Sequence, residues 1–265
     1  MRPHAQAPER TRGSTIGMLG ITAEYYPGQP ILVDLSITAH PGRVTVILGP
    51  NGSGKSTSLR VLAGLIRPRT GRVEIYASGV TTDLSAVPAH ERPLHKVAYL
   101  PQGHSLFPSM TVHDNLLVGA WPIRRNRQAV LAALDAIYER YPLLRTKRRA
   151  FAASLSGGQQ RILEVARLLV CDPDVVLVDE PSAGVAPSIA ASMYEELSRM
   201  RDEGRTVVLV DQDLRPALAV ADTVYMLRSG RNDRSGPVED FSEDVSGLVR
   251  GWLAAPADDL TEGRA

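Results

Sequence analysis

The stretch GPNGSGKST, Gly49 to Thr57, constrains the fold more than any other feature of the sequence. It fits the phosphate-loop pattern G-x-x-x-x-G-K-[ST], with Gly49, Gly54, Lys55 and Ser56 at the required positions. An apolar run, RVTVILG, precedes it, and a helix-like segment, KSTSLRVLAGL, follows it. The stretch therefore predicts a strand, a phosphate-binding turn and a helix, in that order.

Each residue type in this loop suits a phosphate ligand. Glycines let the backbone approach closely and point N–H groups at phosphate oxygens. Lys55 supplies a positive charge, and the Ser56 hydroxyl is able to ligate Mg²⁺. The predicted nucleotide contacts are Gly49, Pro50, Asn51, Gly52, Ser53, Gly54, Lys55, Ser56 and Thr57.

Short apolar runs and amphipathic segments alternate along the rest of the chain. This rhythm predicts an α/β fold with a parallel sheet and crossover helices. The predicted strands are 31–38, 43–49, 175–178 and 206–210, and the clearest predicted helices are 127–141 and 187–201.

Two helical segments have a predicted buried face. In the segment 127–141 the apolar residues Val130, Leu131, Leu134 and Ile137 share that face. In the segment after Gly157 the predicted buried residues are Ile162, Val165, Ala166 and Leu169, and the predicted outward residues are Gln160, Arg161, Glu164 and Arg167.

An acidic pair, Asp179 and Glu180, directly follows the apolar run VVLV. Such a pair on an arbitrary strand is most simply explained as two acidic residues leaving a sheet. In a chain with a phosphate loop, an aspartate at a strand end holds the metal and its water shell. Glu180 is then placed to polarise an attacking water.

A second glycine-rich turn, LSGGQQR, runs from Leu155 to Arg161 and opens another helix. We call it the signature turn. The simplest explanation is a helix start capped by Ser156. A helix N-terminus is also an anion site, because its backbone N–H groups are unpaired.

The four motifs GPNGSGKST, YLPQG, LSGGQQR and VVLVDEPS, in this order, resemble the nucleotide-binding subunit of an ABC transporter. The resemblance covers about residues 17 to 253. It implies a P-loop NTPase of the ABC type, with a mixed or parallel sheet core, an antiparallel β subdomain and an α-helical subdomain at about 104–170. Residues 1–16 and 254–265 are polar and are predicted to be flexible tails.

The resemblance also implies ATP and Mg²⁺ as cofactors and gives roles to further residues. Gln102 corresponds to a glutamine that reaches Mg²⁺, and Tyr26 to an aromatic residue that stacks on adenine, with Tyr25 as the competitor. In this family the signature turn caps the ATP held by a second subunit. The residues so implied are Ser156, Gly157, Gly158 and Gln159.

Two positions depart from the usual family pattern. Gln212 stands where the family usually has a histidine that contacts the γ-phosphate, and none of the six histidines lies beyond His113. A glutamine amide still donates a hydrogen bond but cannot become cationic. Ala186 stands where many members have aspartate. Both departures resemble the second ATP-binding subunit of importers for branched-chain amino acids, or for urea and short amides.

The partners implied are a second ATP-binding subunit, two membrane-spanning permease subunits and, indirectly, an extracytoplasmic binding protein. Because 30 basic residues balance 29 acidic ones, we expect no nucleic-acid partner. No apolar run is long enough to span a bilayer, so we expect a peripheral protein on the cytoplasmic face of the cell membrane.

Two other assignments stay open at this level: a non-transport ABC ATPase such as a cofactor-assembly scaffold, and an exporter subunit that shares the catalytic motifs. A groove for the membrane partner is predicted near 103–116. Phe107, Met110 and Val112 offer apolar contact there, although ordinary core packing explains them equally well.

Overall fold

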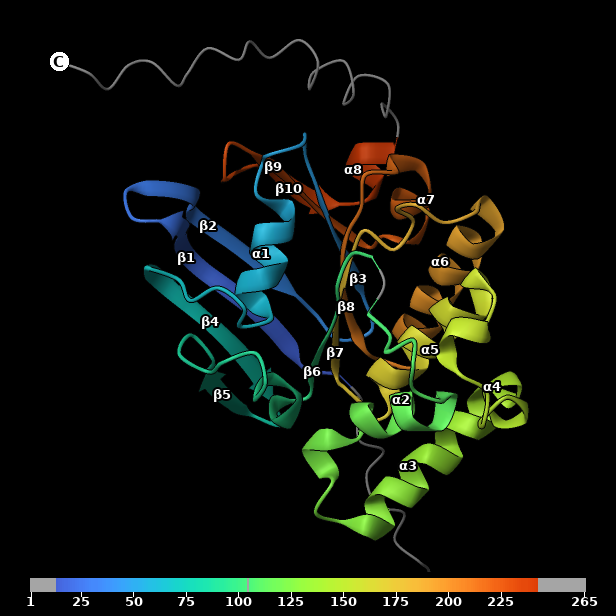
Figure 1. The fold of residues 1–265 in the computed structure, drawn as a ribbon. Coiled ribbons are helices and arrows are strands. Elements are labelled where there is room, and N and C mark those ends of the chain that lie inside the picture. The colour runs from blue at the N-terminus through green and yellow to red at the C-terminus, as the bar shows by residue number, and fades with distance from the viewer. Residues whose placement is uncertain (1–12, 104, 243–265) are drawn as a thin grey trace, which may run out of the picture.

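The computed structural model describes residues 13–103 and 105–242, which form two β-sheets and a set of helices (Figure 1). The predicted tail at 254–265 lies outside the described residues, as do residues 1–12 of the predicted N-terminal tail. The first strand begins at Thr15, slightly before the predicted start of the folded body at 17.

The first sheet is antiparallel, with strand order β2-β1-β4-β5. Strands β1 and β2 form a long hairpin joined by a short turn at Pro27 and Gly28. The strands are β1 (Thr15–Tyr26), β2 (Gln29–Ala39), β4 (Thr70–Ala77) and β5 (Val80–Asp83).

The second sheet has the order β10-β9-β3-β8-β7-β6, and only β10 runs antiparallel to its neighbour. In β3, β7 and β8 every residue is buried, because both faces of the sheet are covered. The strands are β3 (Val44–Leu48), β6 (Val97–Leu100), β7 (Val175–Asp179), β8 (Thr206–Val210), β9 (Thr223–Arg228) and β10 (Arg231–Pro237).

Helices α2 to α5 come between β6 and β7 in the chain. The α-helices are α1 (Lys55–Leu62), α2 (Val112–Gly119), α3 (Arg127–Arg140), α4 (Pro142–Thr146), α5 (Gly157–Leu169), α6 (Pro187–Asp202), α7 (Leu214–Val220) and α8 (Glu239–Ser242). Three 3₁₀ turns lie at Arg92–His95, Trp121–Ile123 and Ala152–Ser154. None of the helices in the described part of the chain is long and apolar enough to cross a membrane.

Two hydrophobic clusters hold these layers together. One lies between the two sheets and includes α1, and the other lies between the mixed sheet and helices α2 to α7 (Figure 1). Adjacent β3 residues serve different clusters, since Val46 faces the helices and Ile47 faces α1. The predicted α/β architecture is thus confirmed, with the carboxyl ends of β3, β6, β7 and β8 free to carry functional loops.

The predicted helix 127–141 is present as α3, but one predicted face residue is wrong. Leu131 is 53% exposed, and Tyr138 joins Leu134 and Ile137 on the buried face instead. The buried face of α3 therefore consists of Leu134, Ile137 and Tyr138, with Val130 partly buried beside them.

In α5, the prediction that Arg161 and Glu164 point outward is also wrong. Both are buried, Glu164 to 1% exposure, and they form an ion pair with 2.6 Å between Arg161 Nη1 and Glu164 Oε2. Glu164 Oε1 accepts a hydrogen bond from the Ser105 backbone N–H, and Arg161 Nη2 donates to the Pro181 carbonyl. The pair therefore joins α5 to the segments that follow β6 and β7.

Candidate functional site

The phosphate loop connects β3 to α1, and two of its glycines, Gly49 and Gly54, leave no room for a side chain. Gly49 has φ +152°, and an added Cβ would lie 2.4 Å from the Leu227 carbonyl oxygen. Gly54 has φ +100°, and a Cβ there would meet a Leu32 methyl at 2.6 Å. Only glycine combines these positive φ values with so close a backbone approach.

Lys55 opens α1 with its ammonium group folded back over the loop. Its Nζ donates to the carbonyl oxygens of Gly49 and Pro50 at 2.9 and 3.1 Å. Burial lowers the pKa of this lysine, while the nearby carboxylates of Glu180 and Asp179 oppose that shift. The Ser53 hydroxyl in the same loop is buried and has no hydrogen-bond partner among the described residues. These donors are arranged to suit phosphate oxygens.

Asp179 at the end of β7 meets the start of α1. Ser56 Oγ donates to Asp179 Oδ1 at 2.9 Å, and the Tyr99 hydroxyl donates to Oδ2 at 3.1 Å. Burial raises the pKa of Asp179, and the two hydrogen bonds act against that rise. The hydroxyl of Ser56, the carboxylate of Asp179 and the nearby Gln102 side chain offer hard oxygen donors. Such a set fits Mg²⁺, which binds one or two protein ligands together with substrate phosphates.

Glu180 follows in an unusual backbone conformation, with φ +46°. Its N–H donates to the Val210 carbonyl at 2.8 Å, which anchors this turn to β8. Its buried carboxylate accepts from two side-chain amides: Gln102 Nε2 at 2.5 Å and Gln212 Nε2 at 2.7 Å. The structure therefore brings together three residues that lie far apart in the sequence.

Gln212 owes its position to the residue before it. Asp211 is buried and accepts from the backbone N–H groups of Gln212 and Asp213 at 2.7 and 3.1 Å. The hydroxyls of Ser182 and Tyr194 donate to the same carboxylate. Asp211 thus ties the loop after β8 to the loop after β7 and to α6.

Of the two candidate tyrosines at the end of β1, Tyr26 has the free ring. It is 71% exposed. Tyr25 has its hydroxyl engaged, since Arg60 Nη1 donates to it at 2.8 Å. A stacked base needs an open ring face, which Tyr26 offers.

The signature turn is arranged differently from the phosphate loop. Ser156 is exposed and caps α5, accepting from the backbone N–H of Gln159, whose side chain in turn accepts from the Ser156 N–H. This reciprocal capping box satisfies donors within the turn itself. A Cβ on Gly157 or Gly158 would make only ordinary contacts, at 3.8 and 3.5 Å from Ile189.

A hollow of about 410 Å³ lies beside the signature turn. It is lined by Gly157, Arg161, Glu180 and the loop 183–186, together with Gly103 and Ile189. Residues 49–57 are not among those lining it. Within this chain, the signature turn therefore shares a surface with Glu180 rather than with the phosphate loop.

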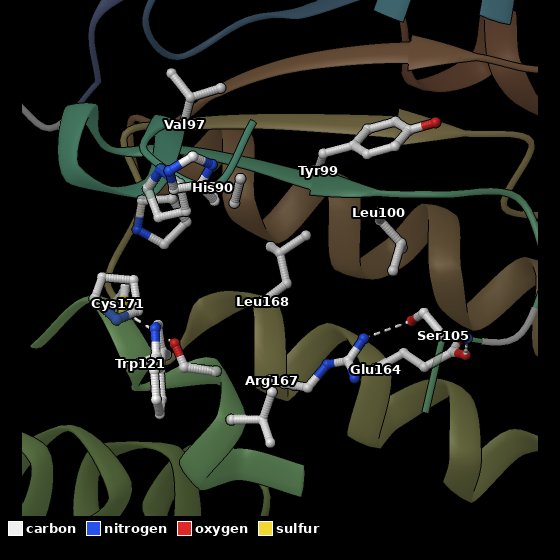
Figure 2. Close-up of a pocket in the computed structure, with 16 residues that line it drawn as sticks. His90, Val97, Tyr99, Leu100, Ser105, Trp121, Glu164, Arg167, Leu168 and Cys171 are labelled. Carbon is white, nitrogen blue, oxygen red and sulfur yellow. Dashed lines mark hydrogen bonds between the residues drawn. The ribbon is translucent and has the colours of Figure 1, made fainter. Parts of the chain in front are cut away.

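A groove of about 370 Å³ separates the helical region from the mixed sheet (Figure 2). Trp121, Leu168 of α5 and Cys171 line it on the helical side, and Val97 and Leu100 of β6 line it on the sheet side. Arg167 donates to the Ser105 hydroxyl at 2.8 Å along one edge. Of the apolar residues predicted for this region, Phe107 and Met110 are partly exposed nearby, whereas Val112 is buried in the core.

Three residues of the site were not predicted from the sequence: Tyr99, Asp211 and Arg161. Asp211 carried a usable signal, because it follows an apolar strand as Asp179 does. Tyr99 and Arg161 lie in the motifs YLPQG and LSGGQQR, but their residue types gave no sign of their contacts, since a tyrosine in a strand usually packs and an arginine on a helix is usually exposed.

Comparison with known proteins agrees with this geometry of a nucleotide-binding cassette. The ABC transporter family matches residues 32–183. The probable branched-chain amino acid transport ATP-binding protein LivF of Archaeoglobus fulgidus is 33% identical over 80% of this chain and 88% of its own length. The lipopolysaccharide export system ATP-binding protein LptB of Haemophilus influenzae is 30% identical over 84% of this chain and 90% of its own length.

A solved structure agrees as well. The ADP conformation of an ATP-binding cassette of an ABC transporter superposes with a TM-score of 0.78 at 27% identity, covering 91% of this chain and 99% of the other. The chain belongs to the ABC transporter family. It is an ATP-binding subunit of that family and an ATPase.

Proposed function

We propose that this chain hydrolyses ATP to drive an importer for a small polar solute, with branched-chain amino acids as the solute. The observation that carries the ATPase part is the Glu180 carboxylate, held by Gln102 and Gln212 next to the Ser56–Asp179 pair. Base, metal ligands and phosphate loop thus meet at the carboxyl ends of β3 and β7.

We assign the binding roles as follows. The loop residues 49–57 surround the phosphates, and Lys55 exchanges its bonds to two loop carbonyls for bonds to phosphate oxygens. Ser56 and Asp179 hold Mg²⁺ with help from Gln102, and the metal neutralises developing negative charge. Tyr26 stacks on the adenine.

Glu180 acts as the base that positions water. A carboxylate has about four lone-pair sites, and the two amides occupy one on each oxygen. A site therefore remains to accept a proton from water. The hydrogen bonds from the two amides also restrain the Glu180 side chain, so its carboxylate is already oriented before the reaction begins.

Gln212 keeps a contact with this base in a chain where the usual histidine is missing. Its amide is neutral at every working pH and donates to Glu180 at 2.7 Å. We assign it the sensing contact toward the γ-phosphate. No ionisation of this side chain then accompanies hydrolysis.

The signature turn completes the site of a second ATP-binding subunit. Its capping box leaves Ser156 and Gly157 exposed, and the turn does not share the hollow beside it with its own phosphate loop. Ser156, Gly157, Gly158 and Gln159 would bring a helix N-terminus to the partner's phosphates.

The groove of Figure 2 suits a membrane subunit, because exposed apolar side chains border it and a groove of this kind favours an apolar helix. We place the chain on the cytoplasmic face of the membrane, with two permease subunits and, beyond them, an extracytoplasmic binding protein.

Two relatives named for branched-chain amino acid transport support the solute, at 33% identity each. A second candidate, lipopolysaccharide export, is supported by relatives at 30 to 31% identity. Because the motifs of the ATP site serve import and export alike, the site does not separate them.

The proposal is tested in two sets of cells, one producing the natural chain and the other producing Glu180→Gln. Both sets also produce the permease subunits that co-purify with the natural chain. We expect radiolabelled leucine uptake and MgATP hydrolysis from the natural chain, and neither from the variant. ATP hydrolysis without leucine uptake would overturn the assignment of branched-chain amino acids as the solute. Absence of hydrolysis from the assembled natural complex would overturn the ATPase assignment of the site.

A further inference from the structure

Tyr99 is the first residue of the YLPQG motif and lies on β6, and its hydroxyl reaches the centre of the nucleotide site. It donates to Asp179 Oδ2 at 3.1 Å, on the opposite side of the carboxylate from Ser56. Asp179 is 1% exposed, so water does not compete freely for these oxygens. The two hydroxyls together hold both oxygens of the carboxylate.

The direction of the Tyr99 hydrogen bond follows from the chemistry of its partner. An ionised carboxylate only accepts, so the single proton of the Tyr99 hydroxyl goes to Asp179. Arg60, one turn along α1 from Ser56, donates to Tyr25 at 2.8 Å, and its positive charge opposes the rise that burial causes in the pKa of Tyr99.

Such a bond matters because a carboxylate that ligates Mg²⁺ must present one oxygen at a defined angle. Outer residues that orient a ligand contribute strongly to metal affinity. Ser56 cannot do this alone, since its hydroxyl is itself a proposed ligand. Tyr99 approaches from the β6 side and leaves the Ser56 side of Asp179 open.

We propose that Tyr99 is a positioning residue for Mg²⁺ at the nucleotide site, acting through Asp179. The inference rests on the proposed roles of Ser56 and Asp179 as metal ligands. Tyr99 itself touches neither nucleotide nor metal in this assignment.

Tyr99→Phe tests the proposal, because it removes only the hydroxyl and keeps the ring that packs between the sheets. The matched control is Tyr225→Phe. Tyr225 packs against the same cluster, but its hydroxyl bonds to the Thr38 backbone. The measurement is the affinity of purified protein for a fluorescent ATP analogue during Mg²⁺ titration and, separately, in excess chelator.

We expect Tyr99→Phe to weaken Mg²⁺ binding in the presence of the analogue by about tenfold, the lower end of the range for residues that orient a metal ligand. Affinity for the analogue in chelator should be unchanged, and Tyr225→Phe should match the parent in both conditions. An unchanged Mg²⁺ affinity overturns the inference, as does an equal loss with and without metal.

A double-mutant cycle separates positioning through Asp179 from a general effect on folding. In an Asp179→Asn background, Tyr99→Phe should produce no further loss of Mg²⁺ affinity, whereas an additive loss contradicts the proposal. If the parent protein itself gains no affinity for the analogue from Mg²⁺, the metal assignment of the proposed function fails. That outcome differs from failure of the Tyr99 inference alone.

Discussion

The phosphate loop and the signature turn are both glycine-rich helix starts, and the structure treats them in opposite ways. The phosphate loop is packed against its own chain: Lys55 and Asp179 are buried, and Gly49 and Gly54 leave no room for a Cβ. In the signature turn Ser156 and Gly157 are exposed, and the two glycines have ordinary space around them. In the proposed function, the phosphate loop thus builds one half of an ATP site within the chain, and the signature turn presents the other half to a second subunit.

The largest expected effect tests the buried half. Glu180→Gln keeps the shape of the side chain but removes the base, so ATP turnover should fall by about 10³-fold, within the range for loss of general-base catalysis. ATP binding should persist. Phosphate release and the solution mass with and without MgATP are the measurements.

Glu195→Gln on the exposed side of α6 is the matched control for this change and should behave as the parent. A dimer of Glu180→Gln that forms only with MgATP would show that two copies complete each other's sites. A monomer that binds ATP would point to a distinct second subunit. Turnover at the parental rate would contradict the assignment of Glu180.

The next effect sharpens the contrast between the two turns. Gly158→Ala has space in its own chain, so folding and ATP binding should be unaffected. Turnover in the assembled complex should fall by roughly 10²-fold, the cost of a small misplacement at a reacting centre. ATPase assays of the complex, together with thermal melts of the free chain, check both parts.

Gly49→Ala provides the comparison within the phosphate loop. Its Cβ would lie 2.4 Å from the Leu227 carbonyl oxygen, so this variant should lose stability or ATP binding in the free chain. If Gly158→Ala damaged the free chain as much as Gly49→Ala did, the two turns would not differ in the way that we describe.

A smaller effect is expected at the adenine end of the site. Tyr26→Ala should weaken ATP affinity by about tenfold, since stacking of a base on an aromatic ring contributes roughly 1–3 kcal/mol. Tyr25→Ala should instead act through Arg60, whose bond it removes. Equilibrium binding of ATP to the two variants is the measurement, and an unchanged affinity in Tyr26→Ala would contradict the stacking role.

The smallest expected effect on ATP turnover is that of replacing Gln212. Gln212→Ala leaves Glu180 with one amide donor and should slow turnover by about tenfold, the lower end of the range for one hydrogen bond to a charged group. A parental rate would show that this contact is idle. Gln212→Asn, which keeps an amide on a shorter side chain, is the conservative comparison.

Gln212→His adds a pH test. An imidazole with an ordinary pKa near about 6.5 is cationic below that pH. The cation would stabilise the Glu180 carboxylate and weaken it as a base, so this variant should lose activity as the pH falls from about 7.5 to 6 relative to the parent. Parallel pH–rate profiles of the two proteins would contradict this expectation.

Prediction from sequence succeeded where local chemistry determines the outcome. The strands at 31–38 and 206–210 and the helix at 187–201 are present almost as predicted. Prediction from sequence failed where the burial of a side chain depends on a residue that is distant in the sequence. Leu131 was predicted to be buried but is 53% exposed, and Arg161 was predicted to be exposed but is buried and donates to the Pro181 carbonyl in the loop after β7.

The sequence by itself determined the phosphate loop, the acidic pair and the parallel sheet between them, because glycine geometry, strand burial and helix capping act over a few residues. The tertiary structure alone decided that Gln102 and Gln212 meet at Glu180, that Tyr99 reaches Asp179, and that the signature turn faces outward. Those contacts join segments from different strands. Their geometry depends on strand order and register, which no local pattern encodes.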